Sequence, residues 1–345
     1  MYDISIQSID LSTNERLKVE GFLSTFNLLL DEDVEHTIAA RVGDEIIGTC
    51  SYAGKVLKCF GIKEGFQEQG IASKLITCLT NHLFDRGIYE TFIFTKPRNL
   101  PLFKGLNYRE VQRVEEVVLL EGGMSNINRY VEKMFKDSGL DKRKKAALVM
   151  NCNPFTLGHR YLIERASEEN DEVVVFIVEE DRSLFPFEVR KNLVKIGTED
   201  LKNVHVLSGG SYIISSATFP SYFLRQEDIK MNAYAKLDAG IFGQYIGSAF
   251  NIEKRYVGTE PYCKTTNQYN EALFKILPKH DIEVIGIDRL NTENTPISAS
   301  EVRILIKAEN YHIIKNLVPR VTYEFLKSNQ ARHIIEKIKR SDSLH

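Results

Sequence analysis

A stretch near the middle of the chain combines residue types that suit phosphate binding. It runs from Asn151 to His159, follows the apolar run Ala146–Met150 and precedes a segment whose apolar residues repeat at helical spacing. We therefore expect a strand, a tight turn and the start of a helix. The N-terminus of a helix offers unpaired N–H groups and a positive dipole end, which favour an anion. Gly158 lets the backbone approach a ligand closely, and His159 adds a hydrogen-bond donor.

A second candidate phosphate site lies far downstream, within Pro296–Arg303. Two serines, Ser298 and Ser300, precede Arg303 at the expected start of another helix. Hydroxyl groups donate hydrogen bonds to phosphate oxygens, and arginine can bind those oxygens with two N–H groups at once. The pattern predicts a second anion site that combines hydroxyls, a guanidinium and a helix N-terminus.

Both elements resemble motifs of one group of enzymes. Thr156-x-Gly158-His159 resembles the nucleotide-binding signature of the adenylyl-transferring superfamily, in a variant with threonine where many members carry histidine. The downstream serine and arginine pattern resembles the second phosphate motif of that superfamily. The resemblance implies that both elements bind one ATP, with Mg²⁺ bound through its phosphates and no metal held by protein side chains. A simpler alternative for His159, a histidine that only bonds to the backbone at a helix start, stays open.

The resemblance also implies roles for individual residues. Nucleophilic attack on the α-phosphate builds negative charge there and on the leaving pyrophosphate, so hydrogen-bond donors are needed at both. The expected catalytic residues are His159, Thr156, Arg303 and Ser300. A loop after strand 255–257 would hold the adenine or ribose, although it could be a plain loop. The expected nucleotide-binding residues are Asn153, Pro154, Phe155, Gly158, Ser298, Gly258, Thr259 and Glu260.

Three further features have weaker functional interpretations. Arg190 could hold an anionic co-substrate, but we favour a surface arginine on a helix. The run Ser215–Pro220 is rich in hydroxyls and could line an acyl site or form a capping turn. Cys152 lies inside the first phosphate loop, but thiols buried near a strand end are usually inert, so we do not expect a catalytic thiol.

A third motif lies in the first third of the chain. Gln69, Gly70 and Ala72 stand between an expected strand at 56–62 and an expected helix at 71–86. The Gln-x-x-Gly-x-Ala pattern resembles the pyrophosphate loop of the GNAT acetyltransferase fold, in which backbone N–H groups face a diphosphate. The resemblance makes Asn99 and Tyr108 candidate contacts for a pantetheine arm. An ordinary helix start is the alternative.

Composition bounds the class of protein. The 345 residues are 43% apolar and 27% charged, with a net charge of −2, which favours neither nucleic acid nor an anionic membrane as partner. The five cysteines are scattered without metal-binding or disulfide spacing, which indicates a reducing compartment. No signal peptide and no apolar run of membrane-spanning length is recognisable, so we expect a cytoplasmic protein.

The pattern of elements predicts two α/β domains. Residues 1–122 are expected to form a GNAT-like α+β domain with a helix at Ser12–Leu30 and a hairpin turn at Gly43-Asp44. Residues 123–143, with a helix capped by Ser125, are expected to be a linker. Residues 144–345 are expected to form a Rossmann-like parallel-sheet nucleotidyltransferase domain with C-terminal helices. Short continuous apolar strands alternating with amphipathic helices are typical of such a sheet, which binds ligands at the carboxyl ends of its strands.

Together the two domains resemble the citrate lyase ligase family. The likeness is carried by Asn153–His159, Tyr212–Pro220, Gly258–Pro261 and Ile297–Arg303. It implies an ATP-dependent ligase that activates acetate as acetyl-adenylate. The acetyl group would pass to the thiol of a coenzyme-A-like prosthetic group on the acyl-carrier subunit of citrate lyase, with release of AMP and pyrophosphate. The first domain would deliver this thiol arm.

Two alternative functions stay open from the sequence. A phosphopantetheine-type adenylyltransferase would share the nucleotide motifs, but it needs a second anion site, for which no clear basic cluster is found. A GNAT acetyltransferase with a nucleotide-sensing domain would turn over acetyl-coenzyme A without ATP. The sequence does not identify the acid or the oligomeric state.

Overall fold

The structure is a computed structural model, and it describes residues 3–179, 183–214, 219, 223, 226–259, 264–292 and 295–341. The chain divides into two compact units: Met1–Tyr130 with Phe219–Leu237, and Val131–Thr218 with Asp238–His345. The first division falls inside helix α4 (Ile127–Ser138), within the segment expected as a linker. No pattern in the sequence indicated that a segment of the later half of the chain belongs to the first unit.

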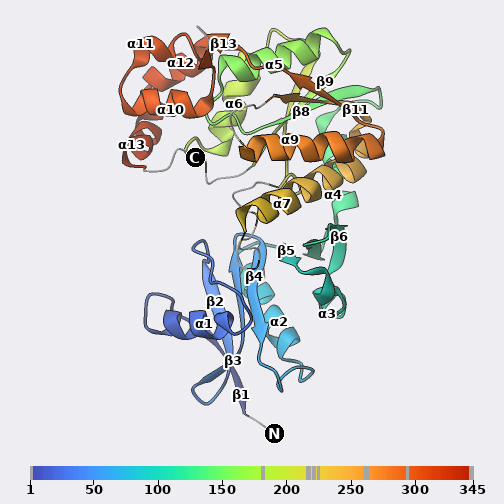
Figure 1. The fold of residues 1–345 in the computed structure, drawn as a ribbon, viewed down its shortest axis with the longest axis vertical. Coiled ribbons are helices and arrows are strands. Elements are labelled where there is room, and N and C mark those ends of the chain that lie inside the picture. The colour runs from blue at the N-terminus through green and yellow to red at the C-terminus, as the bar shows by residue number, and fades with distance from the viewer. Residues whose placement is uncertain are drawn as a thin grey trace. The chain divides into compact units, whose positions relative to one another are not determined.

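The first unit is built on a seven-stranded mixed sheet (Figure 1). Its strands lie in the order β1 (Ile4–Ile9), β2 (His36–Val42), β3 (Glu45–Ala53), β4 (Val56–Ile62), β5 (Glu90–Thr95), β7 (Val118–Gly123) and β6 (Arg109–Arg113). Its helices are α1 (Glu15–Ser24), α2 (Ile71–Asp85), the short 3-10 turn η1 (Pro97–Asn99) and α3 (Leu100–Lys104). Neighbouring strands are antiparallel except β4 and β5, which run parallel and pair only at Val56↔Phe92 and Leu57↔Ile93.

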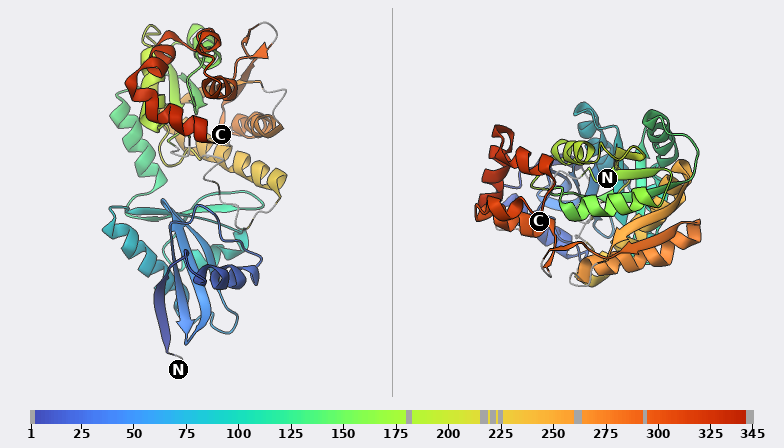
Figure 2. Two further views of the ribbon diagram at one scale, coloured as in Figure 1. Left: turned by 90° about the vertical axis from the view of Figure 1, so that its left-hand side faces the viewer. Right: turned by 90° about the horizontal axis from the view of Figure 1, so that it is seen from above.

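Helices α1 and α2 cover opposite faces of this sheet (Figure 2). Adjacent residues of a strand point to opposite faces. Gly61 of β4, which pairs with Thr49, lies against Phe26 just after α1, whereas Gly48 of β3 lies against Leu75 of α2. The glycines therefore let each helix approach its face of the sheet closely.

One sequence expectation in this unit needs correction at its ends. The helix expected at Ser12–Leu30 is limited to α1, because the hydroxyl of Thr13 accepts the N–H of Glu15 at its start and Asn27 adopts a left-handed φ of +63° beyond its end. The expected hairpin turn is confirmed, with Gly43 at a φ of +56°.

The second unit contains a five-stranded, fully parallel sheet. Its strands lie in the order β10 (Val204–Ser208), β9 (Val173–Ile177), β8 (Lys145–Met150), β11 (Ile252–Gly258) and β12 (Glu283–Ile287). Every residue of β9 is buried, as expected for a strand covered on both faces. From β8 the chain adds strands on one side and later on the other. The carboxyl ends of β8 and β11 are therefore the topological switch point, where doubly wound sheets bind ligands.

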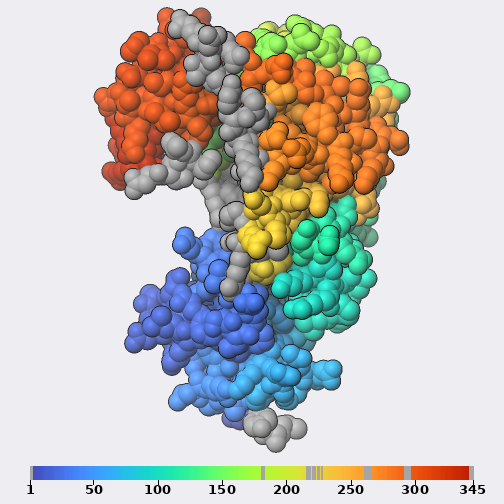
Figure 3. Space-filling model, in the orientation of Figure 1, coloured from blue at the N-terminus to red at the C-terminus, as the bar shows by residue number. Residues whose placement is uncertain are grey.

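Helices complete the second unit. They are α4 (Ile127–Ser138), α5 (Leu157–Glu168), α6 (Phe187–Gly197), α7 (Glu227–Ile241), α8 (Ser248–Phe250), α9 (Lys264–Ile276), α10 (Ala299–Lys307), α11 (Tyr311–Ile314), α12 (Arg320–Lys327) and α13 (Arg332–Arg340), of which α4 and α7 begin in the first unit. Helices α10 to α13 pack around an apolar cluster that also includes Leu184 and Phe185, and they form the red surface in Figure 3.

The start of α4 differs from the sequence expectation. The cap is Asn126, whose side-chain oxygen accepts the N–H of Arg129 at 3.0 Å, and not Ser125. Glu121 accepts the N–H of Ile127 at 2.9 Å. A buried carboxylate therefore satisfies a second N–H group of the first turn. Across the described ranges, no helix has both the length and the apolar character needed to cross a membrane.

Candidate active site

The first motif forms the N-terminus of α5, directly after β8. Thr156 is the capping residue, and its hydroxyl oxygen accepts the N–H of His159 at 3.4 Å. In return, the Nδ1 atom of His159 accepts the N–H of Thr156 at 3.1 Å and lies 2.8 Å from the threonine hydroxyl. These two residues form a capping box with histidine in the place usually taken by glutamate or glutamine.

The capping box determines which ring nitrogen of His159 carries the proton. Because Nδ1 accepts a backbone N–H, it carries no proton, and in the neutral imidazole the proton then sits on Nε2. Burial, followed by the charge of Arg289, lowers the pKa of His159 to about 4. The ring is therefore neutral near pH 7. The simpler alternative for His159, a bond to the backbone at a helix start, describes its Nδ1 atom. Because that bond leaves the proton on Nε2, the Nε2 atom is an N–H donor.

The second motif forms the N-terminus of α10 and meets the first. Arg303 is 5% exposed, and its Nη1 donates to the carbonyl of Asn153, 150 positions away in the sequence. Its Nη2 donates to the hydroxyl of Ser300 at 3.1 Å. A Cβ atom at Gly158 would lie 3.2 Å from the carbonyl oxygen of Ile297, so the backbones of both motifs touch. Ser298 caps α10 by accepting the N–H of Glu301.

The loop between β8 and α5 is held by its own side chains. Asn153, Pro154 and Phe155 are buried, and the side-chain oxygen of Asn153 accepts the N–H of Phe185 at 3.0 Å. The ring of Phe155 stacks on that of His159, with centroids 6.2 Å apart. Through these contacts Asn153 holds the loop and Phe155 packs against the histidine ring.

The interpretation of Arg190 as a surface arginine was wrong. Its side chain is fully buried and donates to the carbonyls of Phe185, Asn151 and Val178 at 2.8–2.9 Å, and to the side chain of Asn151 at 2.7 Å. Arg190 therefore ties together the chain segments that follow β8 and β9. The nearby thiol of Cys152 is buried, and burial raises its pKa, which agrees with an unreactive cysteine.

A cation that sequence reasoning missed lies at the same strand ends. Arg289 follows β12 by two residues, is partly buried, and is close enough to His159 to lower its pKa. The next residue, Leu290, accepts the N–H of Ile297 through its carbonyl at 3.0 Å. The signal that could have revealed it is its position, since a cation just after a parallel strand lies at the ligand-binding edge.

The loop after β11 borders the same helix. Gly258 approaches Leu162 of α5, and its carbonyl accepts the side-chain N–H of Asn270 at 2.9 Å. Thr259 bonds to the carbonyl of Ile287 and, through its hydroxyl, to Asp288. Glu260 lies outside the described residues, as does the run Ser215–Pro220 apart from Phe219, so their expected roles stay predictions.

The third motif forms the N-terminus of α2 in the first unit. Gly70 adopts a φ of +73° as the residue before the helix, and no side chain caps the helix among the described residues. Gln69 donates to the carbonyl of Gly65 at 3.0 Å, and Ala72 lies in the first turn. The N–H groups of this turn are thus not used by a protein side chain, which suits an anion.

Asn99 and Tyr108, the two other candidate ligand contacts in this unit, have different surroundings. Asn99 donates to the hydroxyl of Thr95 at 2.9 Å next to α3. Tyr108 is 4% exposed, its hydroxyl lies 2.8 Å from that of Thr91, and burial raises its pKa. Tyr108 is therefore a core residue, and its interpretation as a ligand contact is corrected.

The fold and the site first define a class: an α/β protein with a GNAT-type unit and a parallel-sheet unit that brings two helix N-termini to one switch point. Comparison with protein families agrees. The family described as "Citrate lyase ligase C-terminal domain" matches residues 145–326, and the "Acetyltransferase (GNAT) family" matches residues 6–107.

Relatives that match about nine-tenths of the chain identify its family. The chain is 36% identical to a citrate pro-3S-lyase ligase of Klebsiella pneumoniae, covering 90% of this chain and 92% of that protein. It is 37% identical to the Escherichia coli (strain K12) protein of the same name, covering 92% of each. A solved GNAT-family acetyltransferase of Staphylococcus aureus Mu50 is 16% identical, covering 35% of this chain and 99% of that one, with a TM-score of 0.30. The chain belongs to the citrate lyase ligase family.

Replacing Arg190 by methionine should destabilise the second unit by about 3 kcal/mol, because several buried carbonyl groups would lose their donor. Urea unfolding of Arg190→Met measures this loss. Lys195→Met, an exposed change on the same helix α6, should stay within about 0.5 kcal/mol of the wild type. Equal stabilities of the two variants would show that Arg190 does not hold the loops.

Acid should destabilise the folded protein through His159. Its folded pKa of about 4 lies below the value of about 6.5 for an exposed histidine, so the unfolded chain binds the proton first as the pH falls. This contribution is fully present above pH ~6.5 and is lost as the pH falls toward 4. His159 as a whole residue is only partly buried, so solvent screening limits the expected loss to about 1–2 kcal/mol. Urea unfolding at pH 7.5 and pH 5 should show wild type losing more stability than His159→Gln, and equal losses would contradict it.

Proposed function

We propose that this protein is an ATP-dependent ligase that activates acetate as acetyl-adenylate and transfers the acetyl group to a coenzyme-A-like thiol arm on the acyl-carrier subunit of citrate lyase. One observation supports the nucleotide site above all: Arg303 bonds to the carbonyl of Asn153, so both phosphate motifs lie at one place. The names of the relatives, citrate pro-3S-lyase ligases, support citrate lyase as the partner.

In the first step, acetate attacks the α-phosphate of ATP. Acetate is already an anion, so no general base is needed. The Nε2–H of His159, the guanidinium of Arg303, the hydroxyl of Ser300 and the N-termini of α5 and α10 donate where negative charge develops on the phosphates. Arg289 adds positive charge on the side of β12. Pyrophosphate leaves, and positioning with charge stabilisation suffices for such a transfer.

Mg²⁺ would enter with the nucleotide. Among the described residues, no group of three His, Cys, Asp or Glu side chains could hold a metal ion. Magnesium keeps several waters and binds phosphate oxygens, so we propose that it is bound through the phosphates of ATP. When bound, it would neutralise triphosphate charge and orient the leaving pyrophosphate.

In the second step, the thiol of the arm attacks the acetyl carbonyl of the adenylate, and AMP leaves. We propose that the first unit binds the arm, with its diphosphate at the uncapped N-terminus of α2 around Gln69, Gly70 and Ala72. Binding the arm raises the effective concentration of its thiol at the adenylate. The described cysteines Cys50, Cys59, Cys78 and Cys152 are free, which supports our proposal that the enzyme works in the reducing cytoplasm.

The two alternative functions have distinct signatures. A phosphopantetheine-type adenylyltransferase would release a stable dinucleotide, and a nucleotide-sensing GNAT acetyltransferase would consume acetyl-coenzyme A without ATP. Neither would exchange pyrophosphate into ATP in response to acetate.

Acetate-dependent exchange of labelled pyrophosphate into ATP tests the proposal. We expect exchange with acetate, because the mixed anhydride forms reversibly. We expect less exchange with propionate, formate or citrate, because the proposed substrate is acetate. Arg303→Met should reduce exchange about 100-fold, since it removes a charged donor from the site. The matched control is Arg332→Met, which removes an arginine from the surface helix α13 and should leave exchange unchanged. Exchange that ignores acetate would reject acid activation.

His159→Ala should cost more than Thr156→Ala in the same exchange assay. The histidine would supply the donor to phosphate, worth about 100-fold, whereas the threonine only orients it. In Thr156→Ala the backbone N–H of residue 156 still bonds to Nδ1, so we expect a loss of about tenfold. Equal losses for the two variants would contradict the assignment of the donor role to His159.

A further inference from the structure

Helices α10 to α13 carry an excess of positive charge. Residues 299–341 contain nine lysines and arginines against four acidic residues, whereas the whole chain has a net charge of −2. Apart from the buried Arg303, all of these cations are exposed. A positive surface on a chain that is acidic elsewhere attracts an anionic partner to one place.

The excess is concentrated where the last turns of α10 and α13 meet. The Nζ atom of Lys307 donates to the carbonyl of Ser341 at 3.0 Å, and Lys339 forms an ion pair with Glu309. These two contacts hold the ends of the helices together. The resulting surface, which we call the basic patch, consists of Lys307, Lys337, Lys339 and Arg340.

Half of the basic patch has no counter-charge bound to it. Within the part of the chain that the structure describes, the side chains of Lys337 and Arg340 form no ion pair and no hydrogen bond. Two acidic residues, Glu309 and Glu336, lie at this end of the helices, so the patch keeps a positive balance. Its free cations are available to a partner.

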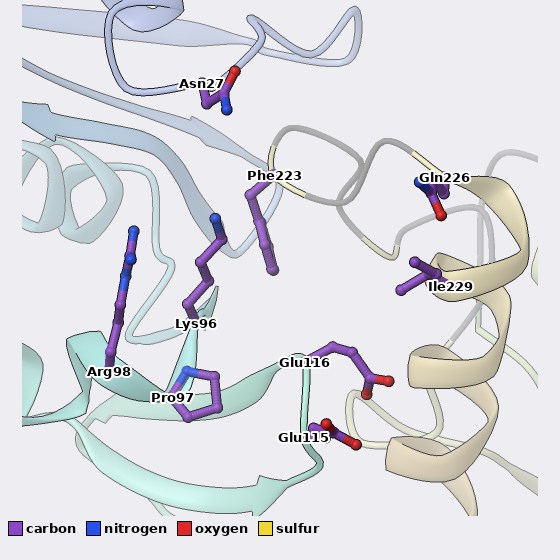
Figure 4. A pocket seen from close by; sticks show the side chains of 9 residues that line it. All are labelled: Asn27, Lys96, Pro97, Arg98, Glu115, Glu116, Phe223, Gln226 and Ile229. Atoms are coloured by element: carbon purple, nitrogen blue, oxygen red, sulfur yellow. The ribbon is translucent and has the colours of Figure 1, made fainter.

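The cavity of the first unit has a different charge balance. It has a volume of about 610 Å³, and two cations, Lys96 and Arg98, line it together with two acidic residues, Glu115 and Glu116 (Figure 4). Equal numbers of both charges give no net attraction for a highly charged partner. The basic patch is therefore the better candidate for binding an anionic surface.

The basic patch begins close to the candidate active site. Lys307 follows Arg303 by four residues, which corresponds to about 6 Å along α10. Ile304 is 49% exposed and lies three residues before Lys307, on the same side of the helix. An exposed apolar side chain among cations is typical of protein interfaces, which combine an apolar centre with a polar rim.

The other anionic partner of large size, a membrane, fits less well. Membrane-bound helices insert an apolar face into the bilayer. The apolar residues of α13, Ile334 and Ile338, are buried in the apolar cluster of α10 to α13 and are not available for insertion. The basic patch thus favours an acidic protein surface.

We propose that the basic patch binds an acidic surface on the body of the acyl-carrier protein, an inference that rests on the proposed function. The carrier must be held beside the phosphate site while its thiol reaches the adenylate, and the patch starts one helical turn from that site. Charge attraction would raise the rate at which the carrier associates. The enzyme would then recognise the carrier by its protein surface as well as by its arm.

Isothermal titration of the full chain with the acyl-carrier subunit of citrate lyase, bearing its arm, tests the proposal at low salt. Lys337→Glu/Arg340→Glu should bind at least tenfold more weakly, and the neutral variant Lys337→Gln/Arg340→Gln about threefold more weakly, because the effect follows the charge. The matched control is Lys275→Glu/Lys279→Glu, which makes the same charge change at the exposed end of α9 and should bind within twofold of the wild type. Circular dichroism checks that each variant is folded.

Salt dependence distinguishes charge attraction from a structural effect. The difference between the wild type and the charge-reversed variant should disappear at about 1 M NaCl, where the Debye length is about 3 Å. A difference that persists at this salt concentration would contradict the proposal, as would equal losses in the charge-reversed variant and the control. Carrier binding by the charge-reversed variant within twofold of the wild type, or no binding by the wild type, would also overturn it.

Two further measurements separate the alternatives. If the wild type binds duplex DNA more tightly than the carrier, and only DNA binding is lost in the charge-reversed variant, the patch is a nucleic-acid surface and the proposal is wrong. Acetate-dependent pyrophosphate exchange needs no carrier and should stay within twofold in every variant. Its absence from the wild type would reject the proposed function, whereas normal exchange with unchanged carrier affinities would reject only the docking surface.

Discussion

The second unit depends on a buried guanidinium that joins two distant pieces of chain. Arg303 reaches from the second turn of α10 to the carbonyl of Asn153 in the loop after β8. A buried charge is tolerated only when hydrogen bonds satisfy it, and here the bonds fall on the backbone of one motif and the hydroxyl of the other. The bond therefore sets the spacing of the two helix N-termini.

The capping box at α5 shows how a structural bond can prepare a chemical group. An ordinary capping box satisfies two backbone N–H groups. Here the returning side chain is His159, and the backbone bond that it accepts at Nδ1 selects the tautomer with a proton on Nε2. Burial keeps the ring neutral, so it donates a hydrogen bond without titrating near neutral pH. Threonine at position 156 is suited to this capping role, because its hydroxyl oxygen accepts the N–H of His159.

Local patterns predicted most of the fold, whereas the support around the site depends on tertiary contacts. The continuous apolar strands, the Gly43 turn and the helix starts at Gly70 and Thr156 all follow from short-range rules. Arg190 was misjudged because its acceptors are backbone carbonyls and one side-chain oxygen in the two loops after β8 and β9, which leave no trace in residue type. The burial of Tyr108 depends on Gly122, whose missing side chain leaves room for the tyrosine ring.

Membership of the two units does not follow chain order. The segment Phe219–Leu237 belongs with Met1–Tyr130, so the polypeptide leaves its second unit and later returns to it. A single break in the gene could not yield two self-sufficient proteins. The amino-terminal product would lack Phe219–Leu237, which belongs to its unit. The carboxyl-terminal product would carry this segment without its packing partners. A recombination event that exchanged only one half would therefore separate segments that pack together in one unit.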